Sequence, residues 1–216
     1  ENKEMKKQLN GTNKTDVEPK KVPSDASKKV PAKKVPSGLN ILSFSPKEGK
    51  EFSGIIDYLT NKTGSNIHDN GTIEVTSNSI DSIYHPKNLL DQNKDNCYEA
   101  KEKERGATVV FDFKDMEIEI TKYTIKAGDW VKDFGHIKNW VIEISNDLNK
   151  WTTIDKHSNS SELNGLNYIK TFNTTNQRFS RYCRFRHTGD YYGMNYLCYM
   201  GFQSIEFYGR LKTTLK

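Results

Sequence analysis

Apolar and polar residues alternate along most of the chain after residue 66, in short runs separated by Gly, Asn, Asp and Ser. β-Branched and aromatic residues dominate these runs, and such alternation is typical of strands with one buried face. In the run that begins at Trp140, the side chains of Trp140, Ile142 and Ile144 share a face. The pattern predicts eight strands, at residues 72–77, 108–113, 118–127, 140–146, 152–157, 168–172, 181–188 and 202–209.

A helical pattern precedes the strands. Ile55, Ile56 and Leu59 fall on one face of a short predicted helix, with Ser53 as its N-cap and Gly64 as its stop. Strands with one apolar face must cover that face with a second sheet. The predicted fold class is therefore all-β, an eight-stranded jelly-roll β-sandwich with a short N-terminal helix.

Composition changes abruptly near residue 38. Residues 1–38 contain eight apolar residues, no aromatic residue, ten lysines and four of the six prolines. This segment cannot bury enough surface to offset the entropy of ordering it, so we expect a disordered basic tail. The predicted organisation is a linker at 1–38, a lead-in segment with the helix at 39–65, a domain at 66–211 and a tail at 212–216.

The tetrapeptide Lys-Lys-Val-Pro occurs three times within the tail, at residues 20–23, 28–31 and 33–36. Each proline favours extended backbone before it, and the lysine pairs repel one another, so the segment is expected to act as a stretched spacer. A basic docking or targeting motif is the alternative. The whole net charge of +5 comes from residues 1–38, which carry ten lysines and five acids.

A charge-balanced domain does not favour specific nucleic-acid binding, and no apolar run reaches the length of a membrane span. The three cysteines, Cys97, Cys183 and Cys198, are too few for a disulfide framework and suit a reducing compartment. We therefore expect reduced thiols and a cytoplasmic protein. Because the sequence begins with Glu1 and shows no signal peptide, we also expect a missing upstream part.

Enzyme chemistry finds no support in the sequence, which lacks a nucleophile elbow, a phosphate-binding loop and a paired-carboxylate motif. We expect no catalytic residues, cofactor or metal. The loop from Asp91 to Glu102 carries oxygen ligands at calcium-loop spacing, but Asn96 stands where the turn needs glycine, so calcium is only an alternative. The five histidines fall at no metal-ligand spacing: His68, His85, His136, His157 and His187.

Alternation along the Arg-rich strand at 181–188 places Arg184 and Arg186 on the outer face and Cys183, Phe185 and His187 on the inner face. We expect the arginines to be salt-bridged or stacked, with an anion site as the alternative.

Three stretches together resemble one family. Residues 139–151 give a strand, an Asp/Asn turn and a tryptophan; residues 179–189 give the Arg-rich strand; residues 205–211 give the closing strand. This set resembles the coagulation factor 5/8 type C, or discoidin, domain, which has a galactose-binding-like fold. Further stretches resemble the intracellular branch found downstream of BTB domains in protist and animal proteins, at residues 72–76, 84–91, 136–140 and 163–165.

The resemblance implies a distorted jelly roll that binds ligands and catalyses nothing. Extracellular members close the domain with a cysteine near each end, but no cysteine lies near Ile67 or Gly209 here. In such domains the loops opposite the chain ends form the ligand-binding rim, which corresponds here to residues 77–85, 128–136 and 190–196. Aromatic residues in loops need a reason other than core burial, and those expected to bind ligand are Tyr84, His85, Trp130, Phe134, Tyr191 and Tyr192, with Met194 and Tyr196 beside them.

The alternative for Tyr84 and Phe134 is that they fold inward and plug the sandwich. The function predicted is a non-catalytic recognition module that binds a protein partner through its rim and is tethered to an upstream domain, with BTB as the candidate. A carbohydrate-binding module, with Trp130 stacking on a sugar beside an Arg or Asn, is one alternative. Phospholipid headgroup binding, with Trp130 and Val131 as an apolar spike, is another.

Overall fold

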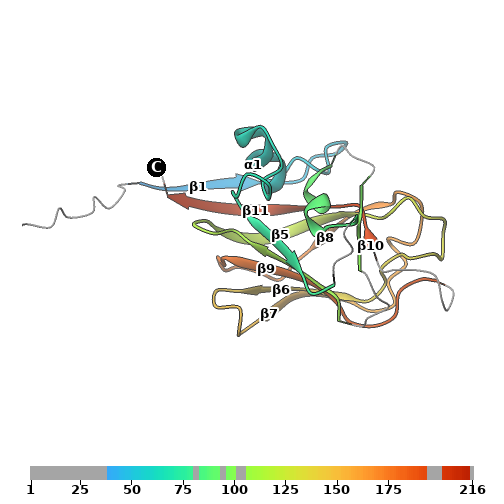
Figure 1. Cartoon of the computed structure of the whole chain (residues 1–216). Coiled ribbons are helices and arrows are strands. Elements are labelled where there is room, and N and C mark those ends of the chain that lie inside the picture. Colours follow the sequence, from blue (N-terminus) through green and yellow to red (C-terminus); the bar gives the residue numbers. More distant parts are fainter. Residues whose placement is uncertain (1–37, 80–82, 93–95, 101–105, 194–200, 215–216) are drawn as a thin grey trace, which may run out of the picture. The chain divides into compact units, whose positions relative to one another are not determined.

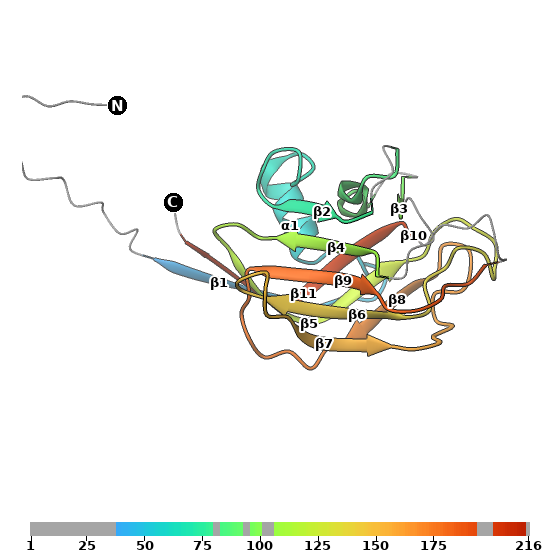
Figure 2. The same cartoon turned by 60° about the horizontal axis from the view of Figure 1, so that its bottom comes forward.

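The computed structural model describes residues 38–79, 83–92, 96–100, 106–193 and 201–214. Two antiparallel sheets pack face to face, one with the strand order β1-β11-β5-β8 and the other with the order β2-β4-β9-β6-β7, and β10 pairs with β3 (Figures 1 and 2). The strands are β1 (Leu39–Phe44), β2 (Glu74–Ser77), β3 (Tyr98–Glu99), β4 (Thr108–Asp112), β5 (Glu117–Lys126), β6 (Trp140–Ser145), β7 (Thr152–His157), β8 (Ile169–Asn173), β9 (Tyr182–His187), β10 (Gly201–Phe202) and β11 (Ser204–Thr214). The helices are α1 (Ile55–Thr63) and the 3₁₀-helix η1 (Pro86–Leu90).

The predicted all-β sandwich is confirmed. Each of the eight predicted strands is present within two residues at its start, and the last, β11, runs well past its predicted end, to Thr214. The alternation did not predict β1, β3 and β10. The last two are only two residues long, and β1 forms because β11 lies beside it, with Leu39 paired to Thr214 and Phe44 to Gly209.

Alternation places the core between the two sheets as predicted. On β9, Cys183, Phe185 and His187 are buried, whereas Arg184 and Arg186 are half-buried on the outer face. The Phe111 ring of β4 meets the Phe207 ring of the other sheet edge-on, with 5.2 Å between centroids. Edge-to-face pairs of this kind add to the free energy gained by burying the rings.

Strand β6 departs from the predicted pattern of one wet face. Trp140, Ile142 and Ile144 face the core as expected, but Val141, Glu143 and Ser145 on the opposite face are also buried. The strand lies between β7 and β9, and the arginines of β9 reach across its outer face. Cross-strand neighbours therefore cover positions that alternation alone assigns to solvent.

A bulge in β5 opposite Tyr208 and Gly209 lets β11 pair along both halves of that long strand. Gly209 has a φ of +134°, and a Cβ at this position would lie 1.9 Å from the carbonyl oxygen of Glu119. Only glycine fits there, because this backbone conformation and this close approach both exclude a side chain.

Helix α1 ends at Gly64 as predicted, but the predicted Ser53 N-cap is wrong. The capping position is Gly54, which has no side chain to offer, and the Ser53 hydroxyl donates to the Lys50 carbonyl instead. The cap comes from β11: the Glu206 carboxylate accepts hydrogen bonds from the backbone N–H groups of Ile56 at 2.8 Å and Asp57 at 3.0 Å. A carboxylate at a helix N-terminus satisfies unpaired N–H groups and interacts favourably with the helix dipole.

The Glu206 side chain is fully buried. It also accepts from its neighbour's N–H, that of Phe207, at 2.7 Å and from the Gln92 amide at 3.0 Å. Burial raises the pKa of Glu206 to about 7, although the backbone N–H groups act in the opposite direction. A Cβ on Gly54 would lie 2.8 Å from the Glu206 side chain, so the helix start and the carboxylate fit together closely.

Several sequence-based expectations lie outside the described residues. They concern residues 1–37 of the predicted linker, the thiol of Cys198, the rim residues Met194 and Tyr196, and residues 93–95, 101 and 102 of the loop between Asp91 and Glu102. Among the helices of the described ranges, none has the length and apolar character needed to cross a membrane.

Candidate functional site

The connections predicted to form the rim lie together at one end of the sandwich. Their described residues are 78–79 and 83–85 between β2 and η1, 128–136 between β5 and β6, and 190–193 after β9, at the end opposite the start of β1 and the end of β11 (Figure 1). The predicted site therefore occupies one end of the molecule, although its residues differ in burial and in contacts.

Trp130 is only half-buried, and its ring lies against two glycines. A Cβ on Gly128 would lie 1.9 Å from the ring, and a Cβ on Gly201 would lie 2.8 Å from it. The indole therefore folds back over its own loop and over β10. Part of its surface supports the loop, and the rest remains open at the rim.

His136 ties this loop to the neighbouring one. Burial lowers the pKa of His136, so its ring is neutral near pH 7 and carries one proton. The Nε2 atom lies 3.1 Å from the carbonyl oxygens of both Trp130 and Val131, which places that proton on Nε2. The His136 carbonyl accepts a hydrogen bond from the Tyr192 N–H at 2.8 Å.

The same loop is held from its other side by Asn164, which is buried. The Asn164 carbonyl oxygen accepts from the Asp133 N–H at 2.8 Å, and its amide donates to the Asp133 carboxylate at 2.6 Å. Asp133 has a φ of +62°. Two hydrogen bonds to one residue fix this left-handed turn, so the loop that carries Val131 and Phe134 is held in place.

Four exposed apolar side chains surround this anchor, and we call them the apolar rim. Val131 is 70% exposed, Phe134 37%, Leu166 56% and Tyr168 52%. Their two loops are joined through backbone hydrogen bonds from Asn167 to Gly128 and from Ala127 to Tyr168. Sequence reasoning missed Leu166 and Tyr168; the signal available was a pair of apolar residues separated by Asn167 directly after a Gly turn.

Tyr191 and Tyr192 lie at the edge of the apolar rim. Tyr191 is half-buried against the core, with its ring 5.9 Å from that of His187. The Tyr192 ring lies 5.2 Å below the Lys138 ammonium, within cation–π range. Of the six predicted ligand-binding residues, the structure thus brings Trp130, Phe134, Tyr191 and Tyr192 together.

Tyr84 and His85 make different contacts. The His85 side chain accepts a hydrogen bond from the Lys87 N–H at 3.1 Å and caps η1. Its ring lies 5.4 Å from that of His68, and burial together with this neighbour lowers the pKa of His85. Tyr84 beside it is half-buried, while Ile83 is 74% exposed.

Comparison with known families decides the identity of this fold. The profile of the F5/8 type C domain matches residues 72–200, more than half of the chain. The chain belongs to the F5/8 type C domain family. The sequence-based resemblance is confirmed at this level, and the chain is a binding module of that family.

Solved structures similar to this F5/8 type C domain come from Clostridium perfringens. A CBM32-3 module from a family 31 glycoside hydrolase aligns with a TM-score of 0.53 and 15% identity, covering 65% of this chain and 93% of the module. The family 32 module of NanJ, in complex with galactose, aligns with a TM-score of 0.51 and 10% identity, covering 64% of this chain and 94% of the module. CpGH89CBM32-5, in complex with GalNAc-β-1,3-galactose, aligns with a TM-score of 0.50 and 15% identity, covering 64% of this chain and 96% of that module. No curated protein matches the sequence.

The arginines of this F5/8 type C domain are paired, as expected. Arg184 and Arg186 both donate to the Glu143 carboxylate, at 2.8 and 3.0 Å from their Nε atoms, and Arg184 stacks on Trp151 with 3.9 Å to the ring. Burial alone would raise the pKa of Glu143, but the two guanidinium groups outweigh it and hold that pKa below its usual range. The two guanidinium groups are thus engaged within the protein.

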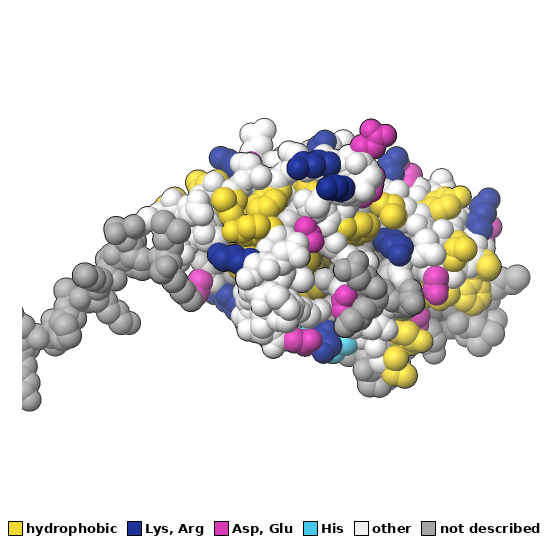
Figure 3. Space-filling view, turned by 90° about the horizontal axis from the view of Figure 1, so that it is seen from above, with side chains coloured by type: hydrophobic (Ala, Val, Ile, Leu, Met, Phe, Trp, Pro, Cys, Tyr) yellow, Lys and Arg dark blue, Asp and Glu magenta, His cyan; other side chains and the backbone are white. Residues whose placement is uncertain are grey.

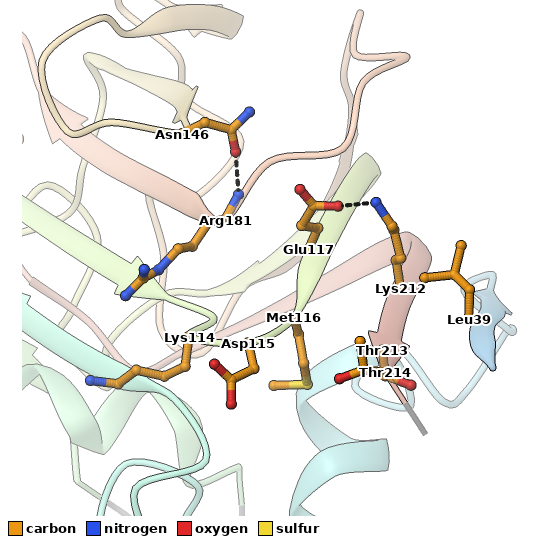
Figure 4. Close-up of a pocket in the computed structure, with 10 residues that line it drawn as sticks. All are labelled: Leu39, Lys114, Asp115, Met116, Glu117, Asn146, Arg181, Lys212, Thr213 and Thr214. Carbon is orange, nitrogen blue, oxygen red and sulfur yellow. Dashed lines mark hydrogen bonds and ion pairs between the residues drawn. The ribbon is translucent and has the colours of Figure 1, made fainter. Parts of the chain in front are cut away.

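The opposite end of the domain contains a hollow of about 400 Å³ (Figure 4). Its cationic side chains are Lys114, Arg181 and Lys212, and each pairs with a carboxylate: Glu74, Asp112 and Glu117. Figure 4 shows Lys114 and Arg181 extending to one side, whereas Lys212 turns toward Glu117. The charges of this hollow are engaged with one another and do not converge on a common point.

Metal ligands do not gather in the parts of the chain that the structure describes: no group of three His, Cys, Asp or Glu residues there could hold an ion. Cys97 and Cys183 are free thiols. Burial raises the pKa of Cys97 to about 12 and that of Cys183 further still, so both stay protonated at pH 7.

Proposed function

We propose that this F5/8 type C domain binds a protein partner through the apolar rim. The observation that supports the proposal is that Val131, Phe134, Leu166 and Tyr168 are exposed on two loops that hydrogen bonds hold together. Clustered apolar side chains left in water mark interaction sites, because covering them releases free energy. Loops held in the bound arrangement lose less entropy on binding.

The chemistry of the apolar rim favours a protein over a sugar or a membrane. Val131 and Leu166 are aliphatic and more exposed than Phe134 or Tyr168, whereas sugar sites combine an aromatic platform with polar groups. Anionic lipid surfaces attract an excess of positive charge. The neighbouring residues carry both signs instead, with Lys132, Lys138 and Lys170 offset by Asp129, Asp133 and Glu162.

Carbohydrate binding is the second candidate function, because two similar structures contain galactose or a galactose-containing disaccharide. Polar and aromatic groups suited to a sugar lie beside the apolar rim. The Tyr192 ring lies next to the Lys138 ammonium, and the Asn139 amide donates to the Asp190 carbonyl at 2.6 Å. A sugar would stack on Tyr192 and accept hydrogen bonds from Lys138.

The proposal extends to the cellular setting. The stretches at residues 72–76, 84–91, 136–140 and 163–165 support a place in the intracellular branch that follows BTB domains. Buried, protonated Cys97 and Cys183 are consistent with a cytoplasmic protein. In this proposal the Lys-Lys-Val-Pro segment tethers the module to an upstream domain, and the full-length reading frame is the observation that tests it.

Capture from cell extract with matched variants tests the proposed function. Leu166→Asp places a charge on the apolar rim, while Leu148→Asp makes the same change at a 48% exposed residue of the β6–β7 turn, at the opposite end. We expect specific proteins, identified by mass spectrometry, to be retained by the wild type and Leu148→Asp and lost from Leu166→Asp. Equal retention by both variants contradicts the proposal.

A glycan array run with the same proteins tests the second candidate. Sugar binding that survives Leu166→Asp but is lost in Tyr192→Ala would favour the carbohydrate function and place its site beside the apolar rim. The wild type failing to bind any glycan leaves the protein-partner proposal as the one to pursue.

A further inference from the structure

Strand β1 lies at the edge of its sheet, where it pairs with β11 on one side only. Its sequence, Leu-Asn-Ile-Leu-Ser-Phe, contains six residues with no charge and no proline. An edge strand of this composition exposes backbone N–H and C=O groups that can pair with another strand.

The other edge strands of the two larger sheets are protected by charge. Strand β2 carries Glu74, which pairs with Lys114, β7 carries Lys156, and β8 carries Lys170, which pairs with Glu162. Charged side chains on an edge oppose the addition of a further strand. Among the described edge strands of the two larger sheets, β1 is the one that lacks this protection.

The outer face of β1 is apolar as well. Leu39 is 59% exposed and Ile41 44%, and Ser43 is exposed beside them, whereas Leu42 and Phe44 on the other face are half-buried. Figure 3 views the molecule from above and shows several groups of hydrophobic side chains at the surface, with charged side chains between them. A strand added to β1 would therefore cover apolar side chains in addition to pairing its backbone.

We propose that β1 pairs with β1 of a second copy of this chain, in antiparallel orientation about a two-fold axis, to join the two four-stranded sheets into one. Two-fold antiparallel pairing places outer-face residues of one copy opposite outer-face residues of the other. The side chains of Leu39, Ile41 and Ser43 in one copy therefore lie beside the same set in the second copy. No charge is buried, because neither strand contains one.

Charge in the preceding sequence favours the antiparallel orientation. Lysines at residues 28, 29, 33 and 34 lie within 11 residues of Leu39 in both copies. Antiparallel pairing sets the two β1 N-termini at opposite ends of the joint strand pair and keeps these lysines apart. Parallel pairing would bring them together, where like charges repel.

Sedimentation velocity of the full chain over a range of concentrations tests this inference. We expect a reversible dimer in the wild type and a dissociation constant raised by about tenfold or more in Ile41→Lys, because both copies then place an ammonium in the apolar strip. Leu166→Lys is the matched control: it adds the same charge to a similarly exposed residue of the apolar rim and should leave the dissociation constant unchanged.

Two outcomes overturn the inference: a wild type that stays monomeric at the highest concentration reached, or a dimer weakened equally by Ile41→Lys and Leu166→Lys. Thermal melts check that both variants fold, and Leu39→Lys, at a still more exposed residue, replaces Ile41→Lys if that variant does not. Partner capture by Ile41→Lys distinguishes the two proposals, because the apolar rim is unchanged in this variant.

Discussion

The hollow at one end of the sandwich and the apolar rim at the other differ in whether their side chains have partners within the protein. At the end that contains the β1 start and the β11 terminus, the cations that line the hollow each meet a carboxylate. At the other end, the four side chains of the apolar rim remain in water although their loops are held firmly. The charges of the hollow are satisfied without a ligand, whereas the apolar side chains of the rim are not covered.

This difference shows why a hollow alone is a poor guide to a binding site. The hollow of Figure 4 has the volume of a small-molecule site, but binding there would first require breaking existing ion pairs. The apolar rim is not marked by volume, but its four side chains carry no charge, so covering them breaks no ion pair of their own. We therefore expect variants at the two ends to separate effects on binding from effects on stability.

The largest effect is expected in the core between the two ends. Trp140 is fully buried, and its indole N–H donates to the Tyr123 hydroxyl at 2.9 Å. Trp140→Ala should lose about 3–5 kcal/mol of stability, measured by urea unfolding. Trp130 is only half-buried, so Trp130→Ala should lose clearly less stability than Trp140→Ala. Equal losses of stability would show that Trp130 is a core residue and not part of the rim.

Glu206 is an exception to the paired charges, because its carboxylate accepts hydrogen bonds from N–H groups of the backbone and of Gln92 and not from cations. Its pKa in the folded protein is about 7, above that of an unfolded Glu, so the folded state binds more protons between about pH 4.5 and 7. Stability should therefore fall as pH rises through this window, by on the order of 2–3 kcal/mol.

Urea unfolding at pH 5, 6, 7 and 8 measures this slope, and Glu206→Gln should remove it because the amide does not titrate. A slope that persists unchanged in Glu206→Gln would assign the pH dependence to another group.

At the apolar rim, the expected change is in binding. Phe134→Ala should weaken capture of the protein partner by about 2 kcal/mol, a typical loss for a central aromatic residue, and leave the melting temperature nearly unchanged. Surface plasmon resonance with the identified partner measures the loss of binding, and calorimetry measures the melting temperature. A large drop in melting temperature would favour the inward-plug alternative for Phe134.

Asn164→Ala tests whether holding the loops matters. The change removes both hydrogen bonds to Asp133 but keeps every apolar side chain of the rim. We expect binding to weaken by about 1 kcal/mol, because a looser loop loses more entropy when it binds. Hydrogen exchange at residues 128–136 should increase in the same variant, and unchanged exchange would rule this explanation out.

The smallest effect is expected at the hollow. Arg181 makes a two-point ion pair with Asp112, at 2.7 and 2.8 Å, but its side chain is 42% exposed. Solvent screening limits such pairs to less than about 1 kcal/mol. Arg181→Ala should therefore change stability little and leave partner capture intact, and a loss of capture would move the binding site to this end.

The alternation of apolar and polar residues predicted most of the strands. It failed where the local structure depends on residues far away in the sequence. The inward face of β9 followed from alternation through Cys183 and Phe185, and Gly64 marked the end of α1. The helix cap could not be predicted, since Glu206 and Ile56 are separated by 150 residues. The site was predicted in part: loop aromatics indicated the correct end, but Leu166 belongs to it only because its loop lies beside residue 128.

The role of β11 sets a constraint on how the domain is made. This strand comes last in the domain, yet it pairs with β1 and supplies the carboxylate that caps α1. Translation at about 5–20 residues per second leaves roughly 7–30 s between the emergence of α1 and that of Glu206 from the ribosome. During this interval the backbone of β1 and the apolar face of α1 lack their final partners, so the earliest part of the domain to be made must wait for the last part before it can fold.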